Sequence, residues 1–348
     1  MIGVAILGAG IGAQHLDGYR ALPAAWDVRL IVDRDTDRAR ALCGDIPVAA
    51  EIETALSDPA VEVIDICLPP HLHVPVACQA LAAGKHVICE KPIATSLAEI
   101  DTLRAAKDAA GKHYFPIFQY RYGPAFTALN ALKDAGLVGR PLIAAAETHW
   151  ARNADYYAID WRGTWAGEQG GAILGHAIHA HDLLCCHAGP VAHVTAALAT
   201  RANDIETEDC GAISFELETG ALATSSITLG AATDETRLRF VFKHLTATSA
   251  TTPYAPGTGT WQFAARDPAQ QPAVDTILAQ VAPGHSGFAG AFTEIHKQLN
   301  NQDNHAVSFE DGARAIELVT AIYDAARNGR RVSLPLTKEH PMYTGWHP

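Results

Sequence analysis

Short apolar runs alternate with helical patterns through the first third of the chain. The predicted strands are continuously apolar, as expected for parallel strands that are buried on both faces. They are Gly3–Leu7, Val28–Val32, Val61–Cys67, Val87–Cys89 and Tyr114–Phe118. The helices predicted between them are Gln14–Leu22, Asp35–Cys43, Val74–Ala83 and Leu97–Ala110. Ser96 and Glu99 have the spacing of a helix capping box, and Gly111 is a plausible C-cap. This alternation predicts right-handed βαβ units and a doubly wound parallel sheet.

The pattern changes after Arg121, where a helix at Pro124–Ala135 is followed by strands. Their alternation of apolar and polar residues is typical of antiparallel strands with one buried face. They are Leu142–Trp150, Val191–Thr200, Cys210–Glu218, Ala221–Leu229 and Leu238–Leu245. Residues 234–283 are rich in Thr, Ala and Pro and give little indication of their structure, and helices return at Gly287–Asn300 and Glu310–Asn328. We therefore expect an α/β protein with two domains, 1–121 and 122–348.

Composition narrows the class of protein. Of the 348 residues, 48% are hydrophobic and 18% charged, as in a globular enzyme, and the net charge of −12 disfavours nucleic acid and anionic membranes as partners. The seven cysteines are odd in number and several lie in apolar runs, which predicts reduced cysteines and a cytoplasmic protein. The apolar N-terminus lacks a basic segment and is interrupted by glycines, so we expect a buried first strand and no signal peptide.

A glycine-rich turn follows the first strand and opens a helix. Its Gly8, Gly10 and Gly12 would allow a pyrophosphate to approach the helix N-terminus, with Ile11 between them. Asp33 ends the second predicted strand about 20 residues later, where an acidic side chain binds the adenosine ribose. The carboxylate favours NAD, although Arg34 beside it leaves NADP possible.

The segment Ala82-Ala83-Gly84-Lys85-His86-Val87-Ile88-Cys89-Glu90-Lys91-Pro92 is more specific. It closely resembles a signature of the glucose–fructose oxidoreductase / inositol dehydrogenase / MocA family. Three other segments resemble that family in the expected order: Pro69–His73, Gln119–Tyr122 and Gly170–Ala172. The resemblance implies an N-terminal Rossmann domain and a C-terminal α/β domain with an open, mostly antiparallel sheet, often used to form homodimers or homotetramers. It also implies hydride exchange between a nicotinamide and a ring hydroxyl of a sugar or cyclitol.

The resemblance also implies a set of cofactor-binding residues. They are Gly8, Gly10, Ile11, Gly12, Asp33, Arg34, Leu68, Pro69, His73, Glu90, Lys91 and Gln119. Lys91 would be catalytic, bonding the reacting hydroxyl and the nicotinamide ribose, with Glu90 supporting the cofactor side and a cis Lys91–Pro92 bond. Outside this motif, a lysine before a proline would be interpreted as a solvated side chain.

A second cluster lies on the helix after Gly170-Gly171. By the resemblance, His179 is the catalytic base and Asp182 the family's trailing aspartate, whereas Gly175 stands where the family has its leading aspartate. His176, beside Gly175, is the candidate substitute and would contact substrate. A divalent metal on His176, His179 and Asp182, joined by His187, is the alternative, but we expect no metal because the order matches no trusted zinc motif. We expect His181 and His187 to be packed within the helix interface.

Substrate recognition is expected from the aromatic segment that runs from Trp150 to Trp165. Aromatic rings stack on sugar C–H faces, so Trp161 and Arg162 are expected nearest the substrate, while the roles of the tyrosines stay open. Arg121 either binds at the family's domain junction or is structural. The leading hypothesis is an NAD-dependent sugar or polyol dehydrogenase. The alternatives are a glycoside-cleaving enzyme that retains its NAD, and a non-catalytic dinucleotide sensor.

Overall fold

The computed structural model describes all 348 residues and divides into two compact units. The first comprises Met1–Gln119 with Gly287–Ile316, and the second comprises Tyr120–Ser286 with Glu317–Pro348. Helix α12 (Phe309–Asn328) is divided between them. The sequence analysis expected domains of 1–121 and 122–348, whereas residues 287–316 are part of the first compact unit.

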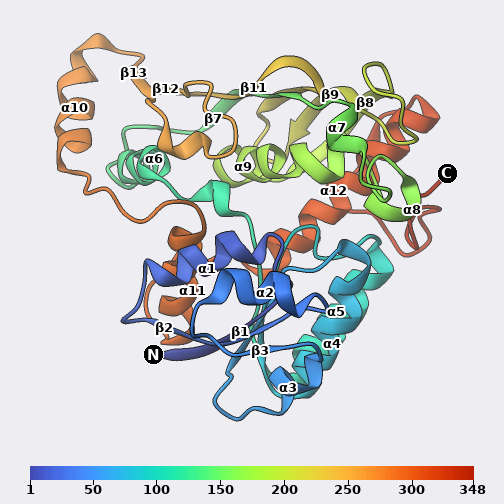
Figure 1. Ribbon diagram of the computed structural model, residues 1–348. Coiled ribbons are helices and arrows are strands. Elements are labelled where there is room, and N and C mark those ends of the chain that lie inside the picture. Colours follow the sequence, from blue (N-terminus) through green and yellow to red (C-terminus); the bar gives the residue numbers. More distant parts are fainter. The chain divides into compact units, whose positions relative to one another are not determined.

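The first unit is built on a six-stranded parallel sheet (Figure 1) with the order β3-β2-β1-β4-β5-β6. This is the strand order of a dinucleotide-binding doubly wound fold, as the alternating pattern predicted. The strands are β1 (Ile2–Leu7), β2 (Trp26–Val32), β3 (Val48–Ala49), β4 (Val63–Ile66), β5 (His86–Cys89) and β6 (Tyr114–Pro116). The helices are α1 (Gly12–Arg20), α2 (Thr36–Cys43), α3 (Ile52–Ser57), α4 (His73–Ala82), α5 (Leu97–Ala110) and α11 (Gly287–Leu299), with a 3-10 turn η1 (Pro70–Leu72).

Local sequence explains the ends of α5. The Ser96 hydroxyl accepts a hydrogen bond from the Glu99 N–H at 3.2 Å, and Gly111 ends the helix in the left-handed conformation at φ 61°. Both caps were predicted. Strand β3 and helix α3 were not, because a two-residue strand and a six-residue helix carry too little periodicity to be recognised.

Helix α11 belongs to the first unit because its apolar face packs on α1 and β2. The Phe292 ring stacks on Tyr19 with ring centroids 3.9 Å apart, and the Trp26 indole N–H donates to the Phe292 carbonyl at 3.2 Å. This helix thus packs in the first compact unit, although the expected boundary placed it in the second domain. The amphipathic pattern predicted the helix correctly but not the sheet that it covers.

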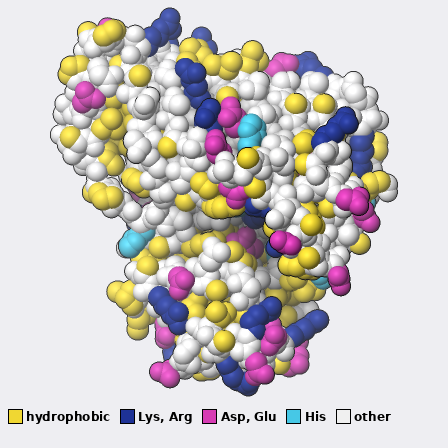
Figure 2. Space-filling view, turned by 45° about the horizontal axis from the view of Figure 1, so that its top comes forward, with side chains coloured by type: hydrophobic (Ala, Val, Ile, Leu, Met, Phe, Trp, Pro, Cys, Tyr) yellow, Lys and Arg dark blue, Asp and Glu magenta, His cyan; other side chains and the backbone are white.

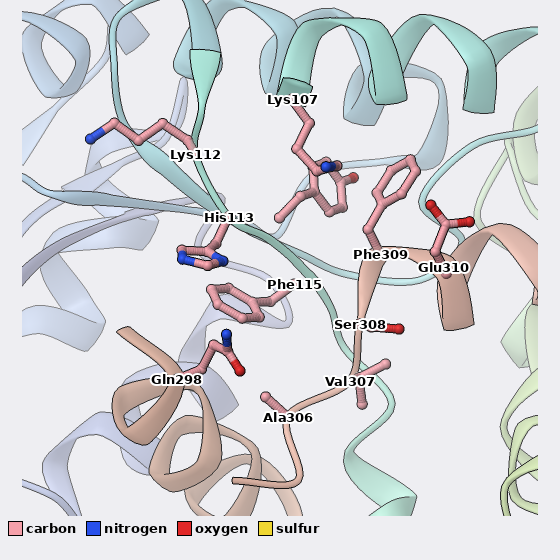
Figure 3. Close-up of a pocket in the computed structure, with 11 residues that line it drawn as sticks. Lys107, Lys112, His113, Phe115, Gln298, Ala306, Val307, Ser308, Phe309 and Glu310 are labelled. Atoms are coloured by element: carbon pink, nitrogen blue, oxygen red, sulfur yellow. The ribbon is translucent and has the colours of Figure 1, made fainter. Parts of the chain in front are cut away.

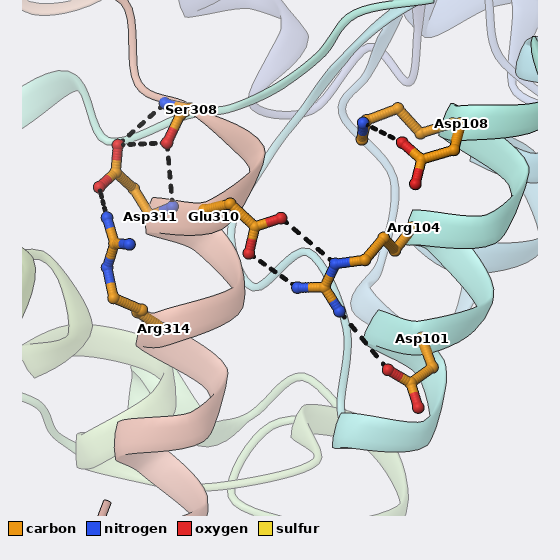
Figure 4. A network of polar contacts seen from close by, with 8 residues as sticks. Asp101, Arg104, Asp108, Ser308, Glu310, Asp311 and Arg314 are labelled. Atoms are coloured by element: carbon orange, nitrogen blue, oxygen red, sulfur yellow. Dashed lines mark hydrogen bonds and ion pairs between the residues drawn. The ribbon is translucent and has the colours of Figure 1, made fainter. Parts of the chain in front are cut away.

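Hydrogen bonds and ion pairs join the start of α12 to α5 in the same unit (Figure 4). The Arg104 guanidinium donates to both oxygens of Glu310, at 3.2 and 2.7 Å, and also contacts Asp101. Ser308 caps the helix by accepting from the Asp311 N–H at 3.2 Å. These contacts order the chain between α11 and α12 on the first unit.

A surface cavity of about 280 Å³ opens beside this chain segment (Figure 3). His113 and Phe115 line it from β6 and the residue before it, Gln298 from the last turn of α11, and Val307 from the segment between α11 and α12. His113 immediately precedes β6, so the cavity lies toward the amino end of that strand. Ligands of such sheets bind at the carboxyl ends, which makes this cavity a poor candidate for the cofactor site.

The second unit contains an eight-stranded mixed sheet with the order β13-β12-β11-β7-β10-β9-β8-β14. Only β7 and β10 pair in parallel, so the sheet is mostly antiparallel, as expected. Its strands are β7 (Pro141–Ala151), β8 (Val191–Ala199), β9 (Cys210–Leu217), β10 (Leu222–Thr228), β11 (Gly230–Phe242), β12 (Leu245–Thr248), β13 (Gln262–Ala265) and β14 (Val332–Ser333). Its helices are α6 (Pro124–Asp134), α7 (Ala154–Tyr157), α8 (Trp165–Glu168), α9 (Ile178–Ala188) and α10 (Gln271–Gln280), with the π-helical segment η3 (Ile173–Ala177) before α9.

The surface charges and the cysteines do not mark a functional site. On the face seen in Figure 2, Lys and Arg side chains are interspersed with Asp and Glu. No disulfide joins the cysteines, of which Cys43, Cys67 and Cys89 are buried and Cys186 is exposed. None of the helices combines the length and apolar character that crossing a membrane requires.

Candidate active site

The glycine-rich turn after β1 has the close backbone packing that a dinucleotide requires. Gly8 has φ +104°, and a Cβ there would lie 2.4 Å from the Cys67 carbonyl oxygen. At Gly12, the first residue of α1, a Cβ would lie 2.9 Å from Ile6. A Cβ at Gly10 would meet no atom within 4 Å, so the turn is tight on its protein side and open beside Gly10. Ile11 is the N-cap residue of α1, whose N-terminus therefore opens directly from this turn.

Asp33 lies buried at the end of β2 and is held as an anion. Its Oδ2 accepts from the Ala9 N–H and from Arg38, both at 2.7 Å, and Oδ1 accepts from the Asp35 N–H at 2.9 Å. Burial works against the charge, but these bonds outweigh it and lower the pKa of Asp33. The contacting arginine is Arg38, whereas Arg34 is exposed. Helix α2 directs Arg38 back to the acid, a contact that the sequence did not indicate, and Arg34 remains a candidate for a 2′-phosphate.

The loop after β5 contains the predicted Glu90-Lys91-Pro92 motif, and its Lys91–Pro92 bond is cis as expected. The Glu90 Oε2 accepts from the Lys91 N–H at 3.1 Å. His73, buried at the start of α4, has Nδ1 2.7 Å from the Pro92 carbonyl and Nε2 2.7 Å from the Leu68 carbonyl. His73 thus joins the loops that follow β4 and β5. Burial lowers the pKa of His73, and the two carbonyls, which would raise it, do not offset that effect.

A fully buried ion network holds Glu90 from the other side. His15 of α1 has Nδ1 2.8 Å from Asp65 Oδ2 and Nε2 3.0 Å from Glu90 Oε1, and the Tyr19 hydroxyl donates to Asp65 at 2.9 Å. Burial alone would lower the pKa of His15, but Asp65 raises it well above its usual value, which gives an imidazolium between two carboxylates. His15, Asp65 and Cys67 also have the grouping of metal ligands. The hydrogen-bond distances and the buried charge pairs account for the cluster without an ion.

This network was not predicted from the sequence. The signal was Asp65, an acidic side chain in the middle of an apolar strand buried on both faces, where an unpaired charge would be strongly destabilising.

The remaining predicted cofactor residues lie beyond the carboxyl ends of two other strands of the same sheet, β4 and β6. Leu68 and Pro69 follow β4, and Pro69 is exposed. Gln119 follows β6, and its Oε1 is buried without a hydrogen-bond partner. An unsatisfied buried acceptor, an open glycine turn and an ionised Asp33, all beyond the carboxyl ends of strands of one sheet, fit a bound dinucleotide.

In the second unit, the Gly170-Gly171 pair lets the chain approach Glu208 closely. A Cβ at Gly171 would lie 2.1 Å from the Glu208 carbonyl oxygen, and one at Gly170 would lie 2.8 Å from the Tyr323 hydroxyl. The Glu208 carboxylate accepts from the N–H groups of Gly171 and Ile173 at 3.3 and 3.0 Å. It thereby caps the start of η3, which leads into the histidine helix.

The predicted catalytic histidines contact different aromatic residues. His179 stacks on Tyr120 with ring centroids 4.3 Å apart, whereas His176 Nε2 lies 3.3 Å from the Tyr156 hydroxyl. Asp182 is bound by Arg121 through two hydrogen bonds of 2.7 and 2.6 Å. A π-helical segment at His176 changes the helical phase, and such segments are frequent at functional sites.

The two histidines expected in the helix interface are buried there. His181 Nε2 lies 3.0 Å from the Ser225 hydroxyl, and burial lowers the pKa of His181 to about 4. His187 accepts from the Lys133 ammonium at 3.2 Å, and burial with that ammonium lowers its pKa. The metal arrangement considered from the sequence would thus require Asp182 to give up Arg121 and His187 to give up Lys133.

The aromatic segment is part core and part surface. Trp150 is buried and Trp165 packs on Tyr323, but Trp161 is 42% exposed. Arg162 lies over the rings of Tyr156 and Trp161. Of the residues expected nearest the substrate, both are therefore at least partly accessible.

Two family models match the chain. The model described as "Oxidoreductase family, NAD-binding Rossmann fold" matches residues 2–118, and the GFO/IDH/MocA C-terminal domain matches residues 126–248.

Curated relatives match part of the chain. The inositol 2-dehydrogenase of Streptomyces avermitilis is 32% identical over 148 residues, 41% of this chain and 43% of that protein. The levoglucosan dehydrogenase of Pseudarthrobacter phenanthrenivorans is 28% identical over 212 residues, 57% of this chain and 54% of that protein. The chain thus spans about half the length of these relatives or less.

Solved structures match over nearly the whole chain. The WlbA dehydrogenase from Bordetella pertussis, in complex with NADH and UDP-GlcNAcA, is 26% identical with a TM-score of 0.83, covering 97% of this chain and 98% of that one. A levoglucosan dehydrogenase in complex with NADH and levoglucosan shares the fold, with a TM-score of 0.80 at 20% identity over 96% of this chain and 100% of that one.

Proposed function

Because this chain belongs to the Gfo/Idh/MocA oxidoreductase family, we propose that it is an NAD-dependent dehydrogenase that oxidises a secondary ring hydroxyl of a sugar, glycoside or cyclitol. The observation that carries the proposal is the Glu90-Lys91-Pro92 loop, which buried His15 and His73 hold at the carboxyl end of β5. A rigidly held ammonium is what a developing alkoxide requires. The relatives named inositol 2-dehydrogenase and levoglucosan dehydrogenase support a cyclic polyol as the substrate class.

We assign NAD to the carboxyl edge of the first sheet. The residues that hold it are Gly8, Gly10, Ile11, Gly12, Asp33, Leu68, Pro69, His73, Glu90, Lys91 and Gln119. Asp33 has three of its acceptor positions filled by the protein, which leaves room for a ribose hydroxyl. Arg34 and Arg38 are the candidates for a 2′-phosphate if NADP is accepted. NAD, when bound, supplies the acceptor for the hydride.

Side chains of this protein remove the hydroxyl proton and stabilise the charge that develops on the oxygen. His179, as a neutral imidazole, takes the hydroxyl proton, and its stacking on Tyr120 fixes the plane of the ring. Lys91 donates to the substrate oxygen and stabilises the charge that develops there. His176 contacts the substrate in place of the family's leading aspartate, and Arg121 with Asp182 positions the histidine helix. No metal is required for these steps.

We further propose that the protein acts in the cytoplasm as a homodimer or homotetramer assembled through the sheet of the second unit. The exposed apolar side chains Ile143 and Leu222 on that sheet support an interface there.

The test is a screen of sugars and inositols in which NADH formation is followed by absorbance. We expect net NADH with at least one cyclic polyol, and severe loss of turnover in Lys91→Met and His179→Ala. Lys243→Met, which removes an exposed lysine of the second unit, is the control and should keep full turnover. Cleavage of a glycoside without net NADH would instead indicate the NAD-retaining glycoside-cleaving alternative, and NAD binding with no reaction would indicate a sensor.

A further inference from the structure

Arg162 is a cation held by aromatic rings with no anion to neutralise it. Its guanidinium carbon lies 3.9 Å from the ring centroid of Tyr156 and 4.9 Å from that of Trp161. Its Nε is buried without a hydrogen-bond partner in the protein. A charged donor that is removed from water and left unsatisfied is unfavourable, so this arrangement favours an external acceptor.

The neighbouring Arg152 provides the contrast. Its Nε is likewise buried without a partner, and its guanidinium lies 4.9 Å from the same Tyr156 ring. The difference is a carboxylate, because the Arg152 Nη1 is 3.2 and 3.3 Å from the two oxygens of Asp234. Two guanidinium groups therefore pack on one tyrosine, and only Arg152 has a carboxylate within the chain. Arg162 is the one available to a ligand.

The backbone that carries Arg162 is fixed from several sides. Gly163 has φ +70°, its N–H donates to Glu168 at 2.7 Å, and its carbonyl accepts from the Glu206 N–H at 2.8 Å. Gly167 packs so closely that a Cβ there would lie 2.1 Å from the Trp161 carbonyl oxygen. A ligand would thus meet a guanidinium that is already oriented, which reduces the entropy lost on binding.

Tyr156 connects Arg162 to the histidine helix. The ring that carries the Arg162 guanidinium has its hydroxyl 3.3 Å from His176 Nε2. Burial raises the pKa of Tyr156, so its hydroxyl stays protonated. A molecule that contacts His176 is therefore separated from the Arg162 guanidinium only by the Tyr156 side chain.

We propose that Arg162 binds an anionic group of the substrate, a carboxylate or a phosphate, so that the enzyme acts on an acidic sugar in preference to its neutral counterpart. This inference rests on the proposed dehydrogenase function and narrows its substrate class. The planar guanidinium donates two parallel hydrogen bonds to such groups, and the opposite charges make these bonds stronger than hydrogen bonds to the neutral hydroxyls of a sugar.

The test compares matched sugars with the NAD-loaded enzyme. The pairs are glucose with glucuronate and galactose with galacturonate, and glucose 6-phosphate separates phosphate from carboxylate as the source of the charge. Arg162→Gln removes the charge, Arg162→Lys keeps it without the planar fork, and Arg266→Gln is the control because it removes an exposed arginine of the same unit. NADH formation gives kcat/KM, and calorimetric titration of the NADH-bound enzyme gives affinity without turnover.

We expect wild type to prefer an anionic sugar, and Arg162→Gln to lower kcat/KM for it about 10- to 100-fold, the usual effect of losing charge-assisted hydrogen bonds. Arg162→Lys should lose less, and Arg266→Gln should match wild type. Two outcomes would overturn the inference and leave the dehydrogenase function intact. In the first, neutral sugars are oxidised with the same kcat/KM as acidic ones; in the second, Arg162→Gln lowers kcat/KM equally for both classes. If acidic sugars bind in an Arg162-dependent manner but no sugar is oxidised, the inference stands and the dehydrogenase function fails. If no acidic sugar binds, the inference is overturned.

Discussion

Replacing His15 with Leu should strongly destabilise the first unit. The imidazolium has no solvent exposure and bonds Asp65 and Glu90 at 2.8 and 3.0 Å. His15→Leu leaves both carboxylates buried without a counter-charge, and breaking a buried ion pair in this way costs about 3–5 kcal/mol. Asp65→Asn in the same chain should recover part of the loss, because one uncompensated charge is then removed.

Hydrogen exchange measured against urea, with peptides from β1 and β4, gives the free energy of unfolding of this unit separately from the other. His86→Gln is the matched control: His86 lies on β5, has no carboxylate partner and has a pKa that burial lowers to about 4. It should cost less than about 1 kcal/mol, as is usual away from a buried network.

The pH dependence gives an independent check. The raised pKa of His15 means that its charge stabilises the fold fully below the unfolded-state pKa of 6.5 and that this contribution is lost as pH rises through the folded-state pKa. The penalty of His15→Leu should therefore shrink at alkaline pH. A loss no larger than that of His86→Gln, or one that does not depend on pH, would refute the buried imidazolium.

Three further predictions follow from other residues. Asp33→Ala should weaken NAD affinity by an order of magnitude or more, because a charge-assisted hydrogen bond is worth about 1.5–3 kcal/mol, and should reduce discrimination against NADP; a wild type that already prefers NADP would contradict the ribose assignment. Lys91→Met should keep NAD affinity and lower kcat about 100-fold, as removal of one preorganised electrostatic group does; unchanged kcat in steady-state assays would dismiss its catalytic role. His181 is buried with its pKa lowered to about 4, so protonation of the unfolded state should cost wild type about 3 kcal/mol between pH 7 and pH 4, a loss that urea unfolding should find absent in His181→Gln.

The first sheet was predictable because parallel strands buried on both faces must be apolar throughout. The second sheet was predictable only in part. Strand β11 begins at Gly230 with exposed polar residues, and β13 is four residues long, so neither shows a clear alternation. The π-helical segment at His176 has no sequence pattern of its own, and the packing of α11 on α1 depends on partners far away in sequence.

The candidate site divides in the same way. Its motif residues, such as Asp33 and Lys91, could be predicted because the chemistry restricts the residue type and its place after a strand. The residues that hold them could not, since Arg38 reaches Asp33 only through the turn of α2, and His15 reaches Glu90 only when α1 packs on the sheet. Only Asp65, a charged residue within an apolar strand, indicated that a buried partner of opposite charge must be present.

The central claim, hydride transfer from a ring carbon to NAD, is tested most directly with deuterated substrate. The wild-type enzyme is given NAD and a sugar or inositol deuterated at its ring carbons, and the NADH that forms is analysed by mass spectrometry. We predict one deuterium in each NADH, with the transfer abolished in His179→Ala and retained in Lys243→Met. NAD that binds but acquires no deuterium from any cyclic polyol would contradict the account.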